Sequence, residues 1–252
     1  MWNAFNTGAY EGMIAETVSM KSGDGRQISA YYSRPLGIPN YPGIVLIPSK
    51  AGWDEFYRET ARRFTQHNYA VLCPNIYQQF GEGTPFEITD RMKENNQSLD
   101  DADVLNDCRG SIDFLKQQPQ SNGKVGVIGM CSGGRHTFMA ACQISGIDAA
   151  VDCWGGGVLP RQEGQHAPID DAKDLCCPLL GIFGSLDHAI SPEGVKKMEE
   201  VLDREKKEYE FHIYEGAGHA FMMYDKPQYC QAQAVEAWEV IEDFFDRHLK
   251  QK

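Results

Sequence analysis

Residues 124–135 read Lys-Val-Gly-Val-Ile-Gly-Met-Cys-Ser-Gly-Gly-Arg, and this stretch decides the fold. Its first half is an apolar run bounded by glycine, which is typical of a buried strand. The glycine pair at 133–134 introduces a helical pattern. The stretch therefore predicts a sharp turn from a strand into a helix, with Cys131 at its apex.

Cys131 stands in the frame Gly-x-Cys-x-Gly, with Gly129 and Gly133 two positions to either side. This frame is that of a nucleophile elbow, with sulfur in place of the usual serine oxygen. Glycine is needed because a Cβ atom at either position would crowd the strained residue at the apex. The helix that follows presents unpaired N–H groups and a partial positive charge to the sulfur, which favours the thiolate. A buried structural cysteine beside a tight turn is the alternative interpretation of the stretch alone.

The composition is that of a globular protein, and we expect residues 1–252 to form a single domain. The net charge is -12 and no basic cluster occurs, so we expect no nucleic-acid partner. No stretch approaches the roughly 18 apolar residues of a membrane span. Residues 1–6 lack the charged and apolar regions of a signal peptide. We therefore expect a cytoplasmic protein with no membrane partner; the sequence does not fix the oligomeric state, and a monomer is the default.

The eight cysteines are scattered along the chain, and no Cys-x-x-Cys pair occurs. A zinc or thioredoxin-like site therefore has little support, and we expect no metal. Without a secretory signal, the cysteines are best interpreted as reduced thiols, most of them buried. Only Cys131 has a setting that indicates reactivity.

Strand and helix patterns alternate along the chain. The expected strands are 16–20, 27–33, 43–48, 69–73, 124–130, 149–153, 179–183 and 210–214. The expected helices are 54–66, 89–118 with a break near Ser98, the elbow helix to about 143, one that begins at 191–193, and 231–250. The alternation predicts an α/β fold with a mostly parallel central sheet, helices on both faces and an antiparallel N-terminal edge. In such sheets the site lies beyond the carboxyl ends of the strands.

A thiol nucleophile needs a base, and the base needs an orienting group. Asp187 follows the strand expected at 179–183, and His219 follows the strand expected at 210–214. Both lie in short loops at the same edge of the sheet as Cys131. The order nucleophile, acid, histidine is one that hydrolases with this kind of elbow use.

Other residues could take these roles. Asp152 lies near the end of the preceding strand and could be the acid, or a capped structural group. His188 adjoins Asp187, but its side chain should point away from that neighbour, so we expect it to stabilise the loop. His136 should be packed on the elbow helix, and His166 could border the pocket from its loop. The remaining histidines are interpreted as surface or helix-end residues: His67, His212 and His248.

Acyl transfer also needs donors for the developing oxyanion, and backbone N–H groups serve in this architecture. One is the residue after the nucleophile, Ser132. The other comes from the loop after the third strand, residues 48–52, where we select the N–H of Lys50. The side chain of Lys50 needs no role.

Several longer motifs add to this frame. They are Arg58-Glu59-Thr60, Cys73-Pro74-Asn75-Ile76-Tyr77, residues 118–126, the Gly-x-Cys-x-Gly-Gly elbow, the Asp187 loop and Gly218-His219-Ala220-Phe221. With them the chain resembles the dienelactone hydrolase family, from about residue 14 to 249. The resemblance implies an α/β-hydrolase fold without a large cap, a triad of Cys131, His219 and Asp187, and no metal or organic cofactor.

The sequence departs from the family pattern at the expected pocket. Where the family carries a glutamate that interacts with the resting thiol, this chain has Ser49. The family's arginine four residues after the triad histidine reads Met223, so one cationic grip on a substrate carboxylate is lost. Arg91 is a candidate for a second arginine, or a helix-surface residue. Further candidates for an apolar pocket wall, or for ordinary core packing, are Trp154, Met222, Met223 and Tyr57.

We therefore expect a hydrolase of small carboxylic esters or lactones that works through a thioester on Cys131. Its partner would be the small-molecule substrate alone. A thioesterase or acyl transferase on the same triad is one alternative. A non-catalytic member that binds a ligand or senses oxidants through its thiol is another.

Overall fold

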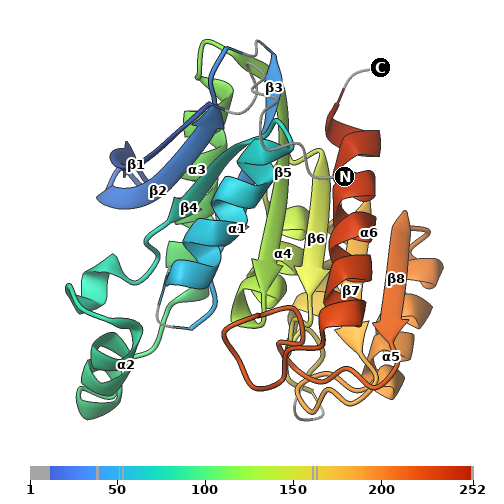
Figure 1. Ribbon diagram of the computed structural model, residues 1–252. Coiled ribbons are helices and arrows are strands. Elements are labelled where there is room, and N and C mark those ends of the chain that lie inside the picture. Colours follow the sequence, from blue (N-terminus) through green and yellow to red (C-terminus); the bar gives the residue numbers. More distant parts are fainter. Residues whose placement is uncertain are drawn as a thin grey trace.

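The computed structural model describes residues 12–37, 40–50, 52, 54–160, 162 and 164–250. Its centre is an eight-stranded sheet with the order β1-β2-β4-β3-β5-β6-β7-β8 (Figure 1). The strands are β1 (Met13–Lys21), β2 (Gln27–Pro35), β3 (Tyr41–Ile47), β4 (Ala70–Pro74), β5 (Ser121–Met130), β6 (Ala149–Cys153), β7 (Leu179–Gly184) and β8 (Tyr209–Tyr214). The expectation of no signal peptide rests on residues 1–6, which lie outside the described residues.

The sheet is mostly parallel. β1 and β2 form an antiparallel hairpin, and β2 also pairs antiparallel with β4. All the other neighbouring strands are parallel. The carboxyl ends of β3, β5, β6, β7 and β8 therefore meet at one edge, the lower edge in Figure 1. The expected fold class is confirmed, including its antiparallel N-terminal edge.

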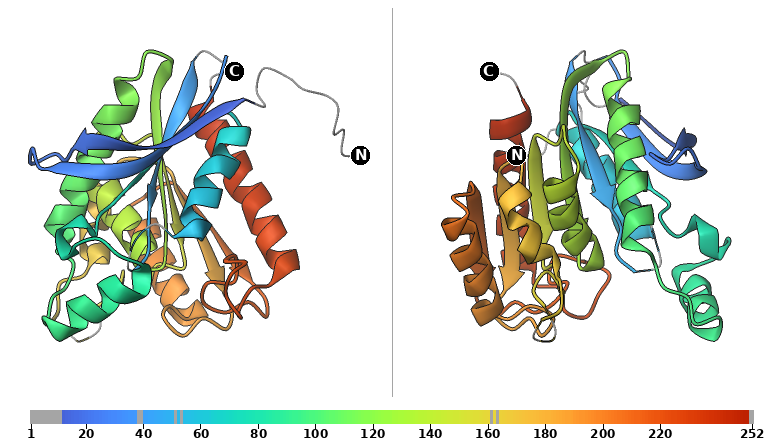
Figure 2. Two further views of the ribbon diagram at one scale, coloured as in Figure 1. Left: turned by 60° about the vertical axis from the view of Figure 1, so that its left-hand side comes forward. Right: turned by 180° about the vertical axis from the view of Figure 1, so that it is seen from behind.

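Helices cover both faces of this sheet (Figure 2): α1 and α6 pack on one face, and α3, α4 and α5 on the other. Strand β3 is buried along its whole length because both faces are covered. Its side chains alternate, so that Ile44 and Leu46 join the core beneath α1 and α6, and Val45 joins the opposite core. The helices are α1 (Glu55–Gln66), α2 (Pro85–Glu94), α3 (Asp101–Lys116), α4 (Ser132–Gln143), α5 (Pro192–Arg204), α6 (Gln231–Leu249) and the short 3-10 helices η2 (Gln78–Phe80) and η3 (Pro168–Asp174).

Side-chain caps fix the starts of several helices. Asp54 accepts a hydrogen bond from the N–H of Tyr57 and begins α1. Ser191 caps α5, with Pro192 at the first helical position, as the sequence predicts. Thr84 begins α2 with a capping box, so this helix starts at Pro85, before the expected residue 89. The gap between α2 and α3 contains the break expected near Ser98.

Two segments between the expected strands and helices contain regular structure. Residues 119–123, between the helix expected to end at 118 and the strand expected from 124, are partly strand, because β5 begins at Ser121 and pairs there with Tyr41 of β3. Residues 154–178, between two expected strands, contain the 3-10 helix η3, with Pro168 at its start and the Asp170 side chain accepting the N–H of Ala167. Short 3-10 turns carry little periodic signal, which is why the sequence pattern did not indicate η3.

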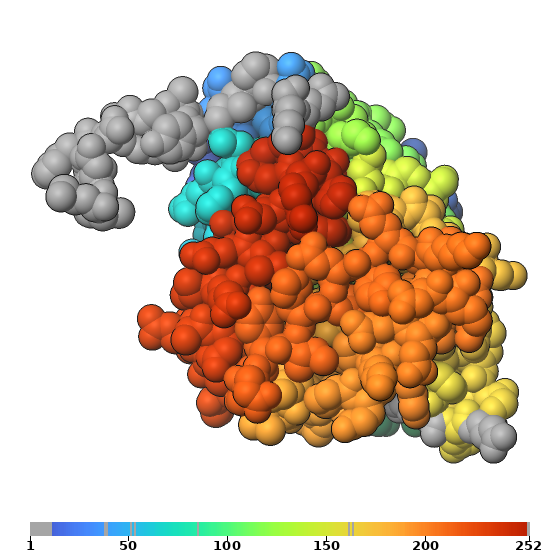
Figure 3. Space-filling view, turned by 90° about the vertical axis from the view of Figure 1, so that its right-hand side faces the viewer, coloured from blue at the N-terminus to red at the C-terminus, as the bar shows by residue number. Residues whose placement is uncertain are grey.

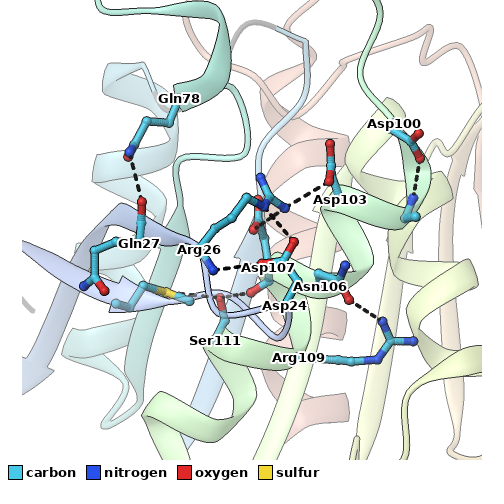
Figure 4. A network of polar contacts seen from close by, with 12 residues as sticks. Asp24, Arg26, Gln27, Gln78, Asp100, Asp103, Asn106, Asp107, Arg109 and Ser111 are labelled. Carbon is cyan, nitrogen blue, oxygen red and sulfur yellow. Dashed lines mark hydrogen bonds and ion pairs between the residues drawn. The ribbon is translucent and has the colours of Figure 1, made fainter.

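Arg26 joins the turn between β1 and β2 to α3 (Figure 4). Its guanidinium lies 2.6 Å from Asp24, 3.1 Å from Asp103 and 3.5 Å from Asp107. The side chain of Asp107 is only 2% exposed, and burial raises its pKa to about 6. Arg26 thus connects the β1–β2 turn to α3 partly through Asp107, a buried carboxyl group whose ionisation is unfavourable.

The C-terminal helix α6, red in Figure 3, is amphipathic and lies on the surface of the molecule. Its buried side includes Trp238, Ile241 and Phe245, whereas Glu236 and Glu239 face solvent. No helix in the described part of the chain is long and apolar enough to cross a membrane.

Candidate active site

Cys131 occupies a strained turn between β5 and α4. Its backbone has φ 57° and ψ -119°, in the region that residues with a Cβ atom rarely adopt. A Cβ atom on Gly129 would lie 2.1 Å from the carbonyl oxygen of Gly133, and one on Gly133 would lie 2.3 Å from that of Ile47. Both glycines are therefore required sterically, and the strain at Cys131 is maintained by close backbone packing around it.

The turn is held from two sides. The N–H of Cys131 donates to the carbonyl of Cys153 at 3.0 Å, and its own carbonyl accepts from Arg135 at 3.2 Å. The Arg135 side chain forms a bidentate pair with Asp101 at 2.6 and 2.7 Å, and His136 Nε2 lies 3.0 Å from the same carboxylate. Hydrogen bonds from His136 and Arg135 hold the pKa of Asp101 well below its usual range. These contacts fix the first turn of α4 against the start of α3.

Asp187 and His219 meet at the same edge of the sheet. The Nδ1 atom of His219 lies 2.9 Å from Oδ2 and 3.1 Å from Oδ1 of Asp187. The Asp187 side chain is fully buried and also accepts the N–H of Ala189 at 2.7 Å, which orients the carboxylate. With Nδ1 occupied by Asp187, Nε2 is the ring nitrogen left to face another group.

That other group is the sulfur of Cys131. Burial acts to lower the pKa of His219, but its hydrogen bonds to Asp187 and to Cys131 outweigh burial and raise the pKa to about 9. An imidazolium next to a sulfur favours the thiolate form of that sulfur. The structure therefore brings together the three residues that the sequence grouped, and it leaves Cys131 partly exposed.

Two rings surround His219. Trp154 follows β6 with φ 43°, is fully buried, and lies edge-on to the His219 ring with centroids 6.5 Å apart. The exposed His188 lies closer, at 5.4 Å between ring centroids. Sequence reasoning missed this contact of His188, because a loop of unknown course does not fix where adjacent side chains point.

The two expected oxyanion donors are available. Among the described residues, the N–H groups of Lys50 and Ser132 have no hydrogen-bond acceptor. The loop that carries Lys50 packs against the elbow, since a Cβ atom on Gly133 would lie 3.2 Å from the carbonyl oxygen of Pro48. The side chain of Lys50 is exposed, and that of Ser49 is partly buried.

The expected pocket residues lie in different surroundings. Met222 and Met223 are buried with 1% and 4% exposure. Met222 lines a groove of about 630 Å³ between α1 and α6, together with Phe56 and Trp238. Arg91 donates to the carbonyls of Phe80 and Glu82, so it ties α2 to the preceding loop.

Asp152 is fully buried, and its Oδ1 accepts the N–H of Gly155 at 2.8 Å. Burial raises the pKa of this carboxyl to about 7. It therefore fits the capped structural group that was one of its two interpretations. The other histidines pair elsewhere: His67 with Glu242, His166 with Asp171, His212 with Glu210, and His248 with the ring of Phe244.

No group of three or more His, Cys, Asp or Glu side chains in the described ranges is arranged to hold a metal ion. The chemistry that the site can support from its own residues is nucleophilic, with the sulfur of Cys131, the imidazole of His219 and two backbone N–H groups.

A mostly parallel sheet with a strained cysteine between β5 and α4, and a buried Asp–His pair after β7 and β8, defines an α/β-hydrolase fold. The model of the dienelactone hydrolase family matches residues 28–249, and the chain belongs to that family. It is thus a hydrolase of the carboxylic-ester and lactone class.

Known proteins are similar over nearly the whole chain. A carboxymethylenebutenolidase from Pseudomonas putida is 30% identical over 237 residues, which cover 92% of this chain and 96% of the relative. A carboxymethylenebutenolidase from Pseudomonas knackmussii gives the same values. A crystal structure from Klebsiella pneumoniae, described as a candidate dienelactone hydrolase, is 28% identical with a TM-score of 0.84 and covers 94% of this chain and 100% of its own.

Proposed function

We propose that this protein hydrolyses small carboxylic esters or lactones through Cys131, His219 and Asp187, with a thioester as intermediate. The observation that carries the proposal is the position of His219. Its ring bonds to the buried carboxylate of Asp187 on one side and to the sulfur of Cys131 on the other, and its pKa is raised to about 9. At neutral pH this arrangement favours a thiolate–imidazolium pair that is ready to attack a carbonyl carbon.

In the first half of the reaction, the thiolate of Cys131 forms a bond to the carbonyl carbon, and an electron pair moves onto the carbonyl oxygen. The N–H groups of Ser132 and Lys50 donate to this oxyanion. The intermediate then collapses, the carbon–oxygen bond to the leaving group breaks, and the leaving oxygen takes the Nε2 proton of His219. With a lactone, the released hydroxyl stays attached to the acyl group.

In the second half, neutral His219 removes a proton from water, and the resulting hydroxide attacks the thioester. Collapse of this intermediate expels the Cys131 thiolate and leaves the carboxylic acid, while His219 is again an imidazolium. Asp187 keeps the ring oriented and stabilises its charge in both halves. The sum is ester plus water to acid plus alcohol.

The substrate we propose is an uncharged ester or lactone. The curated relatives are named carboxymethylenebutenolidase, which points to a lactone ring. In this chain Met223 stands where the family resemblance places an arginine, and the methionine offers no charge to a substrate carboxylate. The buried Trp154 beside His219 supports an apolar boundary to the reacting carbonyl.

We also propose a single-domain, monomeric enzyme of the cytoplasm that needs no cofactor. All eight cysteines are free, and unpaired thiols are what a reducing compartment maintains.

The direct kinetic test is hydrolysis of p-nitrophenyl acetate by Cys131→Ala. We expect kcat to fall about 1,000-fold or more, because the nucleophile is removed. Cys230→Ala is the matched control, since Cys230 is another partly exposed thiol, and it should keep the wild-type rate. Wild-type activity in Cys131→Ala would show that the nucleophile is another group.

A further inference from the structure

The hydroxyl of the buried Tyr57 binds the backbone of the loop after β3. The residue lies on α1, its exposure is 0%, and its hydroxyl oxygen accepts the N–H of Ser49 at 2.8 Å. Ser49 directly precedes Lys50, whose N–H is one of the two proposed oxyanion donors. Tyr57 therefore contacts the loop at 48–50, which carries the Lys50 donor, from the side of the protein core.

The hydrogen bonds of the loop show why this contact matters. Pro48 has no N–H, so the amide of Ser49 is the first donor after the chain leaves β3. The phenol of Tyr57 fixes this donor. The carbonyl of Ser49 accepts the N–H of Gly52 at 3.2 Å. Because a trans peptide points its C=O and N–H in opposite directions, this second bond turns the N–H of Lys50 away from Gly52.

The loop and the elbow are in contact at this point. A Cβ atom added to Gly133 would lie 2.3 Å from the carbonyl oxygen of Ile47 and 3.2 Å from the carbonyl oxygen of Pro48. A shift of residues 48–50 would therefore move the N–H of Lys50 relative to that of Ser132 on the other side. An oxyanion site depends on donors within a few tenths of an ångström of the correct position.

The phenol is suited to a fixed structural task. Burial raises the pKa of Tyr57 well above its ordinary value and outweighs the hydrogen bond to Ser49, which acts to lower it. The hydroxyl therefore stays neutral over the working pH range. The backbone N–H of Tyr57 bonds to the Asp54 cap and its ring lies edge-on to Phe56, so the side chain is held from both ends.

We infer that Tyr57 is a positioning residue of the oxyanion hole, which holds the loop at 48–50 so that the N–H of Lys50 faces the carbonyl attacked by Cys131. The inference rests on the proposed function. The hydrogen bond from Ser49 to Tyr57 orders the loop at 48–50. Ser49 occupies the position at which the family resemblance places a glutamate.

The test compares Tyr57→Phe with Tyr69→Phe in two reactions. Tyr69 is also fully buried with a bonded hydroxyl, to Asp246 at 2.5 Å, but it lies on the α6 side of the core and serves as the matched control. Ester hydrolysis passes through an oxyanion, whereas alkylation of Cys131 by iodoacetamide does not. We expect Tyr57→Phe to lower kcat for p-nitrophenyl acetate about 10- to 100-fold, with KM within about twofold of wild type.

The alkylation rate of Cys131, followed by mass spectrometry on the tryptic peptide 125–135, should stay within about twofold in both variants. A wild-type kcat in Tyr57→Phe would overturn the inference. Equal losses of hydrolysis and alkylation would also overturn it, since Tyr57 would then support the elbow as a whole.

A second variant keeps the test valid if Tyr57→Phe does not fold. Ser49→Pro removes the other partner of the same hydrogen bond, and it should give the same selective loss of kcat. Cys131→Ala separates the two claims. If Cys131→Ala remains active, the proposed function fails whatever Tyr57 does; if it is inactive and Tyr57→Phe matches Tyr69→Phe, only the inference fails.

Discussion

At the scale of single residues, the charge on His219 sets the pH range of the proposed reaction. The hydrogen bonds of its ring to Asp187 and Cys131 raise its pKa to about 9 against the effect of burial. Below that pH the ring carries the proton that the leaving group needs. Above that pH His219 loses this proton, and with it the positive charge that stabilises the thiolate of Cys131.

We therefore predict that kcat/KM for ester hydrolysis falls above about pH 9 with the slope of one ionisation. Asp187→Asn removes a carboxylate that raises the pKa of His219, so this limb should move to lower pH while the maximum rate also drops. The measurement is the pH profile of kcat/KM for both proteins. An identical alkaline limb in the variant would contradict the role given to Asp187.

Single residues also show how far sequence reasoning reaches. Gly129 and Gly133 could be assigned from sequence because local sterics at a tight turn require them. The contacts of Tyr57 with Ser49 and of His188 with His219 could not, because both depend on how separate loops and helices pack. The grouping of Cys131, Asp187 and His219 required only the position of each residue at a strand end.

At the scale of elements, the sequence predicts the strands well and the segment boundaries less well. Strand β6 was expected at the residues where it lies, 149–153, because a short apolar run between turns leaves little choice. α2 begins before its expected start, since the Thr84 cap and Pro85 outweigh the weak periodicity there. The Arg135–Asp101 pair between α4 and α3 is a tertiary contact with no local signal.

The junction between the β1–β2 turn and α3 should respond to pH. Asp107 has a pKa raised from 3.8 to about 6 in the folded protein, mainly by burial. As pH rises, the unfolded chain loses this proton first, so the folded state is destabilised between about pH 4 and pH 6. Below that window the group has no such effect.

Asp107→Asn cannot titrate, so the difference in unfolding free energy between the two proteins should change with pH. We predict that wild type loses about 2 kcal/mol relative to Asp107→Asn between pH 4.5 and pH 7. Urea unfolding of both proteins at the two pH values measures this difference. A difference that is the same at both values would show that the Asp107 carboxyl has an ordinary pKa.

At the scale of the whole molecule, parallel strand order explains why distant residues form one site. β5, β6, β7 and β8 are sequential neighbours in the sheet, so the loops after them open at one edge. The nucleophile, Trp154, the acid and the base follow these four strands in turn. β3 lies next to β5, which brings the Lys50 loop to the other side of Cys131.

Catalysis through the sulfur of Cys131 requires a covalent acyl-enzyme, and its most direct test is detection of the acyl group on Cys131. The protein is mixed with p-nitrophenyl acetate, quenched in acid within the first turnover, digested with trypsin and analysed by mass spectrometry. We predict an acetyl group as a thioester on peptide 125–135, absent from Cys131→Ala. Ester turnover with the acetyl group on another peptide, or with no acyl-enzyme at any quench time, would contradict it.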